Sequence, residues 1–253
     1  MISAMPMRLT ASCIPVKDIA HRDVRAMFEL HSAHYVSDEF TFFADLAKKS
    51  WVIQLFDEDE NLRGFSTLVL WSHNIGDRDI NVVFSGDTII DPRYWGSRAL
   101  PIKWLEVTGA LHAQDSSTPL YWLLTSMHPR TYRSLPLFYR HFYPSWRADY
   151  DELARIVEHV GRARFGANFD ASRGVVVGEG PLKPSVANIM PSNMDGADIR
   201  YFLERNPRHA SGDELVCLAR LEASNHGPVA RRFFLRGAAL GLVDGPRHLS
   251  AAE

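Results

Sequence analysis

One segment near the middle of the chain combines residue types that suit the binding of an anion. The segment DTIIDPRYWGSRALPIKWLEV (87–107) has the pattern of a strand, an Asp-Pro junction, a loop with arginine and glycine, and a helix. A helix N-terminus has unpaired N–H groups and partial positive charge, so it suits a pyrophosphate. Arg98 can add charge-assisted bonds to a phosphate. We expect the backbone donors to be those of Trp95, Gly96, Ser97, Arg98 and Ala99.

The strand before this loop carries a candidate catalytic carboxylate, Asp87. It follows Gly86, and a glycine within a strand often marks a β-bulge. A bulge at Gly86 would turn the side chain of Asp87 toward a cleft, where it could take part in proton transfer. An edge aspartate without a catalytic role fits the same pattern, and both interpretations stay open.

Two other groups of side chains have less specific patterns. His31 and His34 are three residues apart on a predicted helix and share a face, but no third metal ligand is evident, so we interpret them as a surface pair. Arginines recur after residue 128 without an acidic residue among them until 147. This series either helps to hold an anion or forms a solvated helix face, which is the commoner case. It consists of Arg130, Arg133, Arg140 and Arg147.

The predicted elements arrange these residues around a sheet. Composition and periodicity predict strands over 7–14, 51–56, 64–71, 80–90, 120–127, 173–180 and 214–222. They predict helices over 99–113, 130–142, 151–165, 198–206 and 228–242, and two more between 21 and 49. The strand 80–90, the helix 99–113 and the buried strand 120–127 follow one another directly. This succession is a βαβ unit, which implies parallel pairing of its two strands.

The composition indicates an ordinary globular protein. Hydrophobic residues make up 46% and charged residues 23%, and the net charge of -2 gives no case for a nucleic-acid groove or a membrane-binding face. The two cysteines, Cys13 and Cys217, cannot form a disulfide framework and fit a reducing, cytoplasmic setting. No stretch approaches the roughly 18 apolar residues of a membrane-spanning helix. We therefore expect a soluble cytoplasmic protein without nucleic-acid or membrane partners.

The order of the predicted elements resembles the GNAT superfamily of N-acetyltransferases. The resemblance is carried by DTIIDPRYWGSRALPIKWLEV (87–107), YWLLTSM (121–127) and LFYRHFY (137–143). It implies an α/β fold with a GNAT-like mixed twisted sheet flanked by helices, in a single domain over 1–253. The core covers about 8–150. The extension over 151–253 contains the final strands and a helical insertion at 181–213.

The resemblance also implies an acyl-CoA site and a catalytic tyrosine. Ile90 matches the apolar residue that ends the family's strand before Asp-Pro, and the loop after it would hold the pyrophosphate of acetyl-CoA or another acyl-CoA. The family pattern is Gln or Arg, two residues, Gly, one residue, and Gly or Ala. Aligned on the Asp-Pro junction, these three positions hold Trp95, Arg98 and Leu100. In a frame that begins at Arg93, the chain matches the first two positions with Arg93 and Gly96, but has Arg98 at the third. Tyr139 best matches the family's general acid, with Tyr143 and Tyr132 as alternatives.

These features lead to two hypotheses. The first is an acyltransferase that moves an acyl group, expected to be acetyl, from acyl-CoA to an amine of a small molecule. The second is a GNAT-fold binding or regulatory protein without transferase activity. A carrier-protein donor is a further alternative, because the acyl-CoA loop departs from the family pattern. The acceptor and the oligomeric state stay open, a homodimer included.

Overall fold

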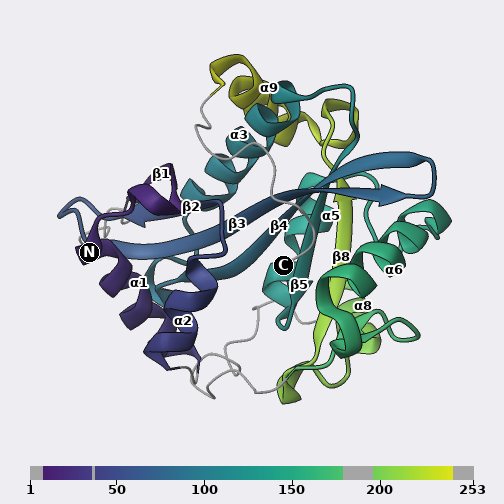
Figure 1. Ribbon diagram of the computed structural model, residues 1–253, viewed down its shortest axis with the longest axis horizontal. Helices are drawn as coiled ribbons and strands as arrows, with labels where there is room; N and C mark the ends of the chain where they lie inside the picture. Colours follow the sequence, from purple (N-terminus) through teal and green to yellow (C-terminus); the bar gives the residue numbers. More distant parts are fainter. Residues whose placement is uncertain (1–7, 36–37, 179–195, 242–253) are drawn as a thin grey trace.

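The computed structural model describes residues 8–35, 38–178 and 196–241, and its centre is an eight-stranded mixed sheet (Figure 1). The strand order is β1-β2-β3-β4-β5-β8-β7-β6. β4 and β5 are parallel, whereas the other neighbouring strands are antiparallel. The predicted mixed sheet flanked by helices and its parallel βαβ pair are thus confirmed. The strands are β1 (Thr10–Pro15), β2 (Trp51–Phe56), β3 (Leu62–Ile75), β4 (Arg78–Ile90), β5 (Leu120–Ser126), β6 (Phe169–Asp170), β7 (Val175–Val176) and β8 (Glu214–Arg220).

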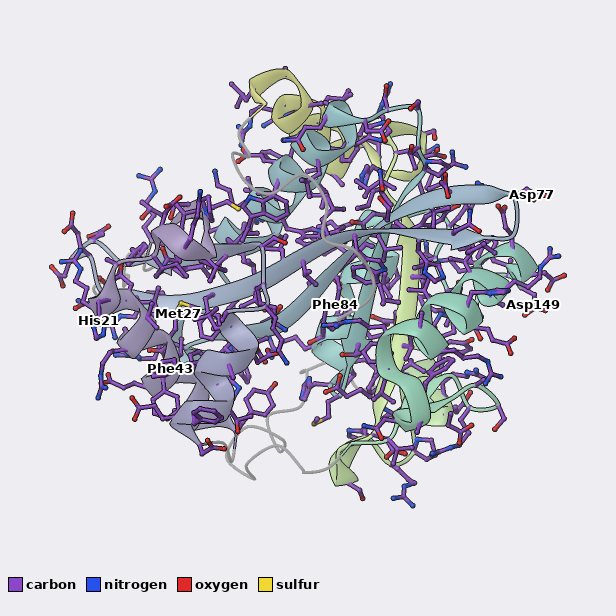
Figure 2. The ribbon with its side chains drawn as sticks, viewed as in Figure 1. His21, Met27, Phe43, Asp77, Phe84 and Asp149 are labelled. Carbon is purple, nitrogen blue, oxygen red and sulfur yellow. The ribbon has the colours of Figure 1, made fainter. Side chains whose placement is uncertain are left out.

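Helices cover both faces of the sheet because side chains alternate in direction along each strand. One face packs against α3 (Ala99–Gln114), α4 (Pro129–Tyr132), α5 (Ser134–Phe138), α8 (Ala197–Arg205) and α9 (Pro228–Leu240). The other packs against α1 (His21–His34), α2 (Glu39–Leu46) and α6 (Asp151–Phe165). On β4, Val83 belongs to the first face and Phe84 to the second. Figure 2 shows Phe84 between the α1–α2 pair and α6.

The β2–β3 hairpin is closed by a turn that Asp57 organises. Its carboxylate accepts hydrogen bonds from the backbone N–H groups of Asp59 and Asn61 and pairs with Arg63 at 2.6 Å. Aspartate commonly stabilises turns by such local bonds. The acidic turn predicted between the two strands is confirmed, and β3 then extends further than predicted, to Ile75.

Helices α3 and α9 pack closely through two glycines. A Cβ atom added to Gly109 would lie 1.9 Å from the carbonyl oxygen of Phe234. One added to Gly237 would lie 1.8 Å from the carbonyl oxygen of Glu106. The backbones approach each other because neither glycine has a side chain. The two glycines thus let α9 pack directly against α3.

The region after β5 differs from the prediction. A helix was expected over about 130–142, bent or begun at Pro136. That prediction is wrong, because the chain forms the short helices α4 and α5 instead, and Pro136 lies inside α5. Tyr139 follows α5 in an extended conformation and forms an isolated β-bridge with His226. The N–H of Tyr139 still donates to the carbonyl oxygen of Leu135 as the cap of α5, whereas that of Arg140 donates to Asn225. The helix ends at Phe138 because its carbonyl oxygen accepts from Gly227 instead of from the next helical turn.

The last part of the chain belongs to the same sheet as the first. β8 lies beside β5, and α9 lies on α3. The strand expected over 173–180 is confined to β7 within the described residues, and the short β6 was not predicted. Part of the insertion expected at 181–213 lies outside the described residues. Its described part contains α8 and a 3-10 turn at His209–Ser211.

Candidate active site

Strand β4 leaves β5 about halfway along β4, near the end of β5. They pair from Asn81–Leu120 to Ser85–Leu124. Beyond that point β4 continues beside β3 to Ile90, while β5 continues beside β8. The β3–β4 register also shifts here, so that two residues of β4, Gly86 and Asp87, face one residue of β3. The expected bulge at Gly86 is therefore present at the separation.

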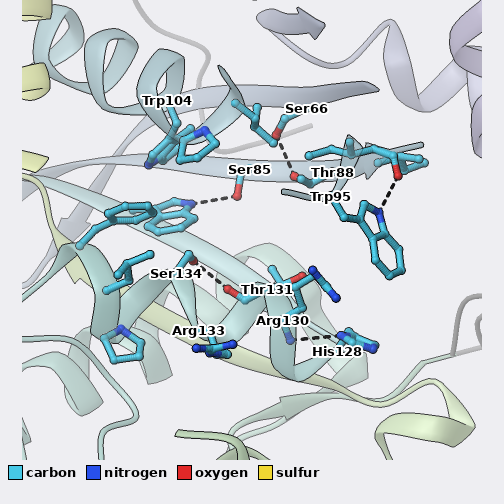
Figure 3. A pocket seen from close by; sticks show the side chains of 18 of the residues that line it. Ser66, Ser85, Thr88, Trp95, Trp104, His128, Arg130, Thr131, Arg133 and Ser134 are labelled. Carbon is cyan, nitrogen blue, oxygen red and sulfur yellow. Dashed lines mark hydrogen bonds between the residues drawn. The ribbon is translucent and has the colours of Figure 1, made fainter. Parts of the chain in front are cut away.

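A cavity of about 750 Å³ opens at this separation (Figure 3). That volume lies within the ordinary range for small-molecule and cofactor sites. Figure 3 shows Ser66, Ser85 and Thr88 of the sheet on one side, and the segment from His128 to Ser134 opposite. Aromatic side chains form much of the remaining wall; they are Tyr35, Trp95, Trp104, Trp122, Phe138 and Trp146.

Three arginines give this cavity a positive rim. The guanidinium of Arg130 lies 4.3 Å from the centre of the Trp95 ring, and that of Arg147 lies 5.0 Å from the centre of the Trp146 ring. Arg133 pairs with Asp198 at 2.9 Å. Burial and the neighbouring charge of Arg133 lower the pKa of Arg130. Three of the four arginines in the predicted series thus line one cavity, rather than forming only a solvated helix face.

The predicted acyl-CoA loop contributes to the cavity only in part. Ile90, Trp95 and Ser97 line it. The indole nitrogen of Trp95 donates to the carbonyl oxygen of Ile90 at 2.8 Å, which fixes the ring along the end of β4. Arg93 is exposed and holds Asp91, whose pKa it lowers. Gly96, Arg98 and Ala99 do not line the cavity.

Several of the expected backbone donors already have partners within the loop. The N–H groups of Trp95 and Ser97 donate to carbonyl oxygens at 3.3 and 2.8 Å, and that of Ala99 donates to the Ser97 hydroxyl at 3.2 Å. Pro101 in the first turn of α3 has no N–H group. The helix N-terminus therefore offers fewer free donors to an anion than the sequence pattern predicts.

Tyr139, the residue predicted as general acid, is sealed in the core. It is 2% exposed, and its hydroxyl accepts a hydrogen bond from the indole nitrogen of Trp104 at 3.3 Å. Its ring packs against Trp122 and His226. Burial raises the pKa of Tyr139. Trp104 and Trp122 line the cavity, whereas Tyr139 does not.

Asp87 lies beside the cavity and pairs with a histidine. Its Oδ1 is 3.7 Å from Nε2 of His31, and its side chain is 30% exposed. Burial raises the pKa of Asp87, but the hydrogen bond with His31 and the charge of Lys49 lower it more, so the net shift is downward. Lys49 is itself held at 2.8 Å by Asp45. Asp87 is thus an ionised group at the separation, outside the lining of the cavity itself.

The end of α1 contributes residues that the sequence analysis did not assign to the site. His31 and His34 are 9% and 7% exposed, so their interpretation as a surface pair is wrong. His34 and Tyr35 line the cavity, and the ring of Tyr35 stacks on that of His31. Burial, then the charges of Glu214 and Asp87, raise the pKa of Tyr35. Helical spacing from Met27 to Tyr35 was the available signal, because it puts these rings on the apolar stripe of α1.

Comparisons with known proteins add a set of distant structural likenesses. No protein-family model matches the sequence, and no curated protein matches it significantly. A probable N-acyltransferase from Enterococcus faecalis is 16% identical with a TM-score of 0.39, over 53% of this chain and 33% of that one. This chain thus spans about a third of that protein's length.

Two further solved structures show a similar degree of likeness. The GNAT family N-acetyltransferase YhbS from Escherichia coli, in complex with CoA, is 13% identical with a TM-score of 0.37, over 50% of this chain and 67% of that one. A GCN5-related N-acetyltransferase from Kribbella flavida is 14% identical with a TM-score of 0.37, over 93% of this chain and 61% of that one.

In the described residues no helix has the length and apolar character needed to cross a membrane.

Proposed function

We propose that this protein transfers an acyl group from an acyl-CoA thioester to an amine of a small molecule. The observation that carries the proposal is the cavity where β4 leaves β5. A long, flexible donor with an anionic end and a reactive end needs a roomy site with a positive rim, and this cavity has a volume of about 750 Å³ and three arginines in its lining. Catalysis of such a transfer depends on holding the thioester and the amine in contact.

The chemical character of the cavity fits such a donor. Arg130 and Arg147 have no carboxylate partner among the described residues, so both are available to phosphate oxygens. Trp104 and Trp122 give the inner part apolar walls, and Ser85 and Thr88 add hydroxyl groups on the strand. In the proposal the phosphates lie at the arginine rim and the thioester lies where the strands separate.

Asp87 keeps a supporting role in this proposal. Its ionised carboxylate holds the buried ring of His31, on which Tyr35 stacks. Asp87 thereby positions the end of α1 against the cavity. Tyr139 has no part in the proposal, because its hydroxyl faces Trp104 in the core.

One observation favours the alternative of a carrier-protein donor. The turn bonds of Trp95, Ser97 and Ala99 leave few free N–H groups for a pyrophosphate. A phosphopantetheine thioester on a carrier protein has the same reactive end but only a single phosphate, so it needs fewer N–H donors from this loop. The two donors therefore differ in how much their affinity depends on the N-terminus of α3.

Calorimetric titration with acetyl-CoA and with a longer acyl-CoA tests the proposal. Arg130→Glu should weaken binding at least about tenfold, since a hydrogen bond to a charged group contributes roughly 1.5–3 kcal/mol. Arg140→Glu is the matched control, because Arg140 is exposed and does not line the cavity. Arg98→Glu separates the donors: loss of binding supports a role for the loop in holding pyrophosphate.

Absence of binding to the wild-type protein would contradict an acyl-CoA donor. A titration with an acylated carrier protein would then separate the two remaining hypotheses. Binding would support transfer from a carrier, and no binding would favour a binding or regulatory protein without transferase activity.

A further inference from the structure

His34 has an unexplained buried nitrogen at the wall of the cavity. Its Nδ1 lies 2.8 Å from the carbonyl oxygen of Leu30. A carbonyl oxygen only accepts, so in the neutral ring Nδ1 carries the hydrogen and Nε2 carries a lone pair. That Nε2 is buried and has no hydrogen-bond partner among the described residues. An unsatisfied buried polar atom calls for an explanation, and a ligand that donates a hydrogen to it is one.

Tyr35, the next residue, brings a hydroxyl to the same cavity. It is the tyrosine among the lining residues, whereas Tyr139 is sealed behind Trp104 and Trp122. The carboxylates of Glu214 and Asp87 lie close enough to disfavour its ionised form. Tyr35 therefore keeps its proton and acts as a hydrogen-bond donor. Two adjacent residues of the cavity wall thus carry one lone pair and one O–H group.

We infer that the end of α1 supplies the proton-transfer machinery of this protein, with His34 moving the proton and Tyr35 stabilising the leaving sulfur. The inference rests on the proposed function. The amine nitrogen attacks the thioester carbonyl, a C–N bond forms and the C–S bond breaks. The proton that the nitrogen loses passes to Nε2 of His34 and then to the thiolate sulfur. An amide and a free thiol leave, and the histidine returns to its neutral form.

Tyr35 has a separate task in this sequence of events. Its O–H donates a hydrogen bond to the sulfur while negative charge develops there, and it keeps its proton throughout. A fixed donor aimed at developing charge in a dry site is an effective form of transition-state stabilisation. His31 and Asp87 act as positioning residues, because the stacked ring of His31 supports that of Tyr35.

Other candidates in the cavity fit these tasks less well. His128 uses Nδ1 to accept a hydrogen bond from the backbone N–H of Arg130, as the cap of α4. Ser85 accepts a hydrogen bond from the indole nitrogen of Trp122 at 2.8 Å. Thr88 is held by Ser66 and Gly86. Each of these groups already has a hydrogen-bond partner, whereas Nε2 of His34 has none within the part of the chain that the structure describes.

The test is the release of thiol from acetyl-CoA with hydroxylamine as the amine probe. The wild-type protein should accelerate this reaction, and His34→Ala should lower the accelerated rate about 100-fold, the usual range for loss of a proton-transfer group. Acetyl-CoA binding, measured by calorimetry, should stay within about threefold of the wild type. Free imidazole should restore part of the lost rate, which a merely structural role of His34 would not allow.

A second histidine with a buried ring nitrogen provides the matched control. His112 on α3 also has a buried nitrogen without a partner among the described residues, but it packs against Phe234 away from the cavity. His112→Ala should leave the rate unchanged. A His34→Ala protein that keeps the wild-type rate, or whose lost rate imidazole does not restore, would overturn the inference.

The two proposals fail in distinguishable ways. A wild-type protein that binds acetyl-CoA without accelerating the reaction would contradict the proton-transfer assignment alone. A wild-type protein that does not bind acetyl-CoA would contradict the acyl-CoA donor, and the inference with it.

Discussion

Tyr139 and Tyr35 have different surroundings: Tyr139 is buried in the core, whereas Tyr35 lines the cavity. Tyr139 lies under α3 and α9, where two glycines bring the helix backbones together. Tyr35 lies at the end of α1, against a cavity and near two carboxylates. The family pattern points to the first tyrosine and the three-dimensional arrangement to the second. A residue's place in the order of elements therefore does not by itself give it access to the cavity.

The largest effect should come from adding a side-chain atom where α3 and α9 are in close contact. Gly237→Ala puts a Cβ atom against the backbone of Glu106, so one helix must move. We expect the free energy of unfolding to fall by about 3 kcal/mol, because overpacking against backbone is poorly relieved. Urea denaturation measures this. Gly227→Ala is the control, since its added Cβ meets nothing within 4 Å. Equal stability of the two variants would show that the packing around Tyr139 is looser than described.

Tyr35→Phe should produce the next largest effect, on rate rather than on stability. Without the O–H group, thiol release from acetyl-CoA with hydroxylamine should slow about 100-fold, as when one oxyanion donor is removed. The defect should shrink with phenyl thioacetate, whose leaving thiolate is more stable and needs less help. An equal defect with both thioesters would contradict the contact with sulfur.

Tyr139→Phe should show the opposite behaviour. The variant leaves the buried indole nitrogen of Trp104 without its acceptor. A buried unpaired donor costs roughly 1–3 kcal/mol, so the unfolding midpoint in urea should fall. The rate of thiol release, measured under conditions where the variant is folded, should match the wild type. A large loss of rate without loss of stability would restore Tyr139 as the acid.

The smallest effect concerns Glu214, near Tyr35. Burial raises its pKa, the hydrogen bond with Thr125 lowers it, and Asp87 raises it, so the net shift is upward. The unfolded chain then loses this proton at lower pH than the folded protein, and Glu214 costs stability as pH rises above about 4.3. Glu214→Gln lacks this cost. Its stability relative to wild type should increase between about pH 4 and pH 7 in chemical denaturation, and a constant difference would contradict the raised pKa.

Much of the scaffold could be predicted because its patterns are local. The stripes of α1 and α6 follow helical periodicity, and the apolar run of β5 is typical of a strand buried on both faces. Gly86 correctly indicated a bulge beside Asp87. These features depend on neighbours within a few residues, which the sequence displays directly.

The site could be predicted less well because it depends on contacts between distant segments. Tyr139 leaves the expected helix to pair with His226, which is far away in the sequence. His34 resembles a surface residue until α1 is packed on the sheet. The arginine series becomes a rim only when α4 and α5 break the expected helix at Arg133. Contacts between segments far apart in the sequence therefore determine which residues with reactive side chains lie close together.

The most direct test of the central claim is to fill the cavity at the strand separation. Thr88→Trp puts a large side chain where the proposed donor binds. Thr88 lines the cavity and is exposed, so the larger side chain has room there. Calorimetry with acetyl-CoA should give binding to the wild type and at least tenfold weaker binding to the variant, or about 1.4 kcal/mol. The variant also loses the hydrogen bond with the buried Ser66 hydroxyl, so its thermal unfolding midpoint should fall, and binding is measured at a temperature where it is folded. Equal affinity of the two proteins would contradict the placement of the donor between β4 and β5.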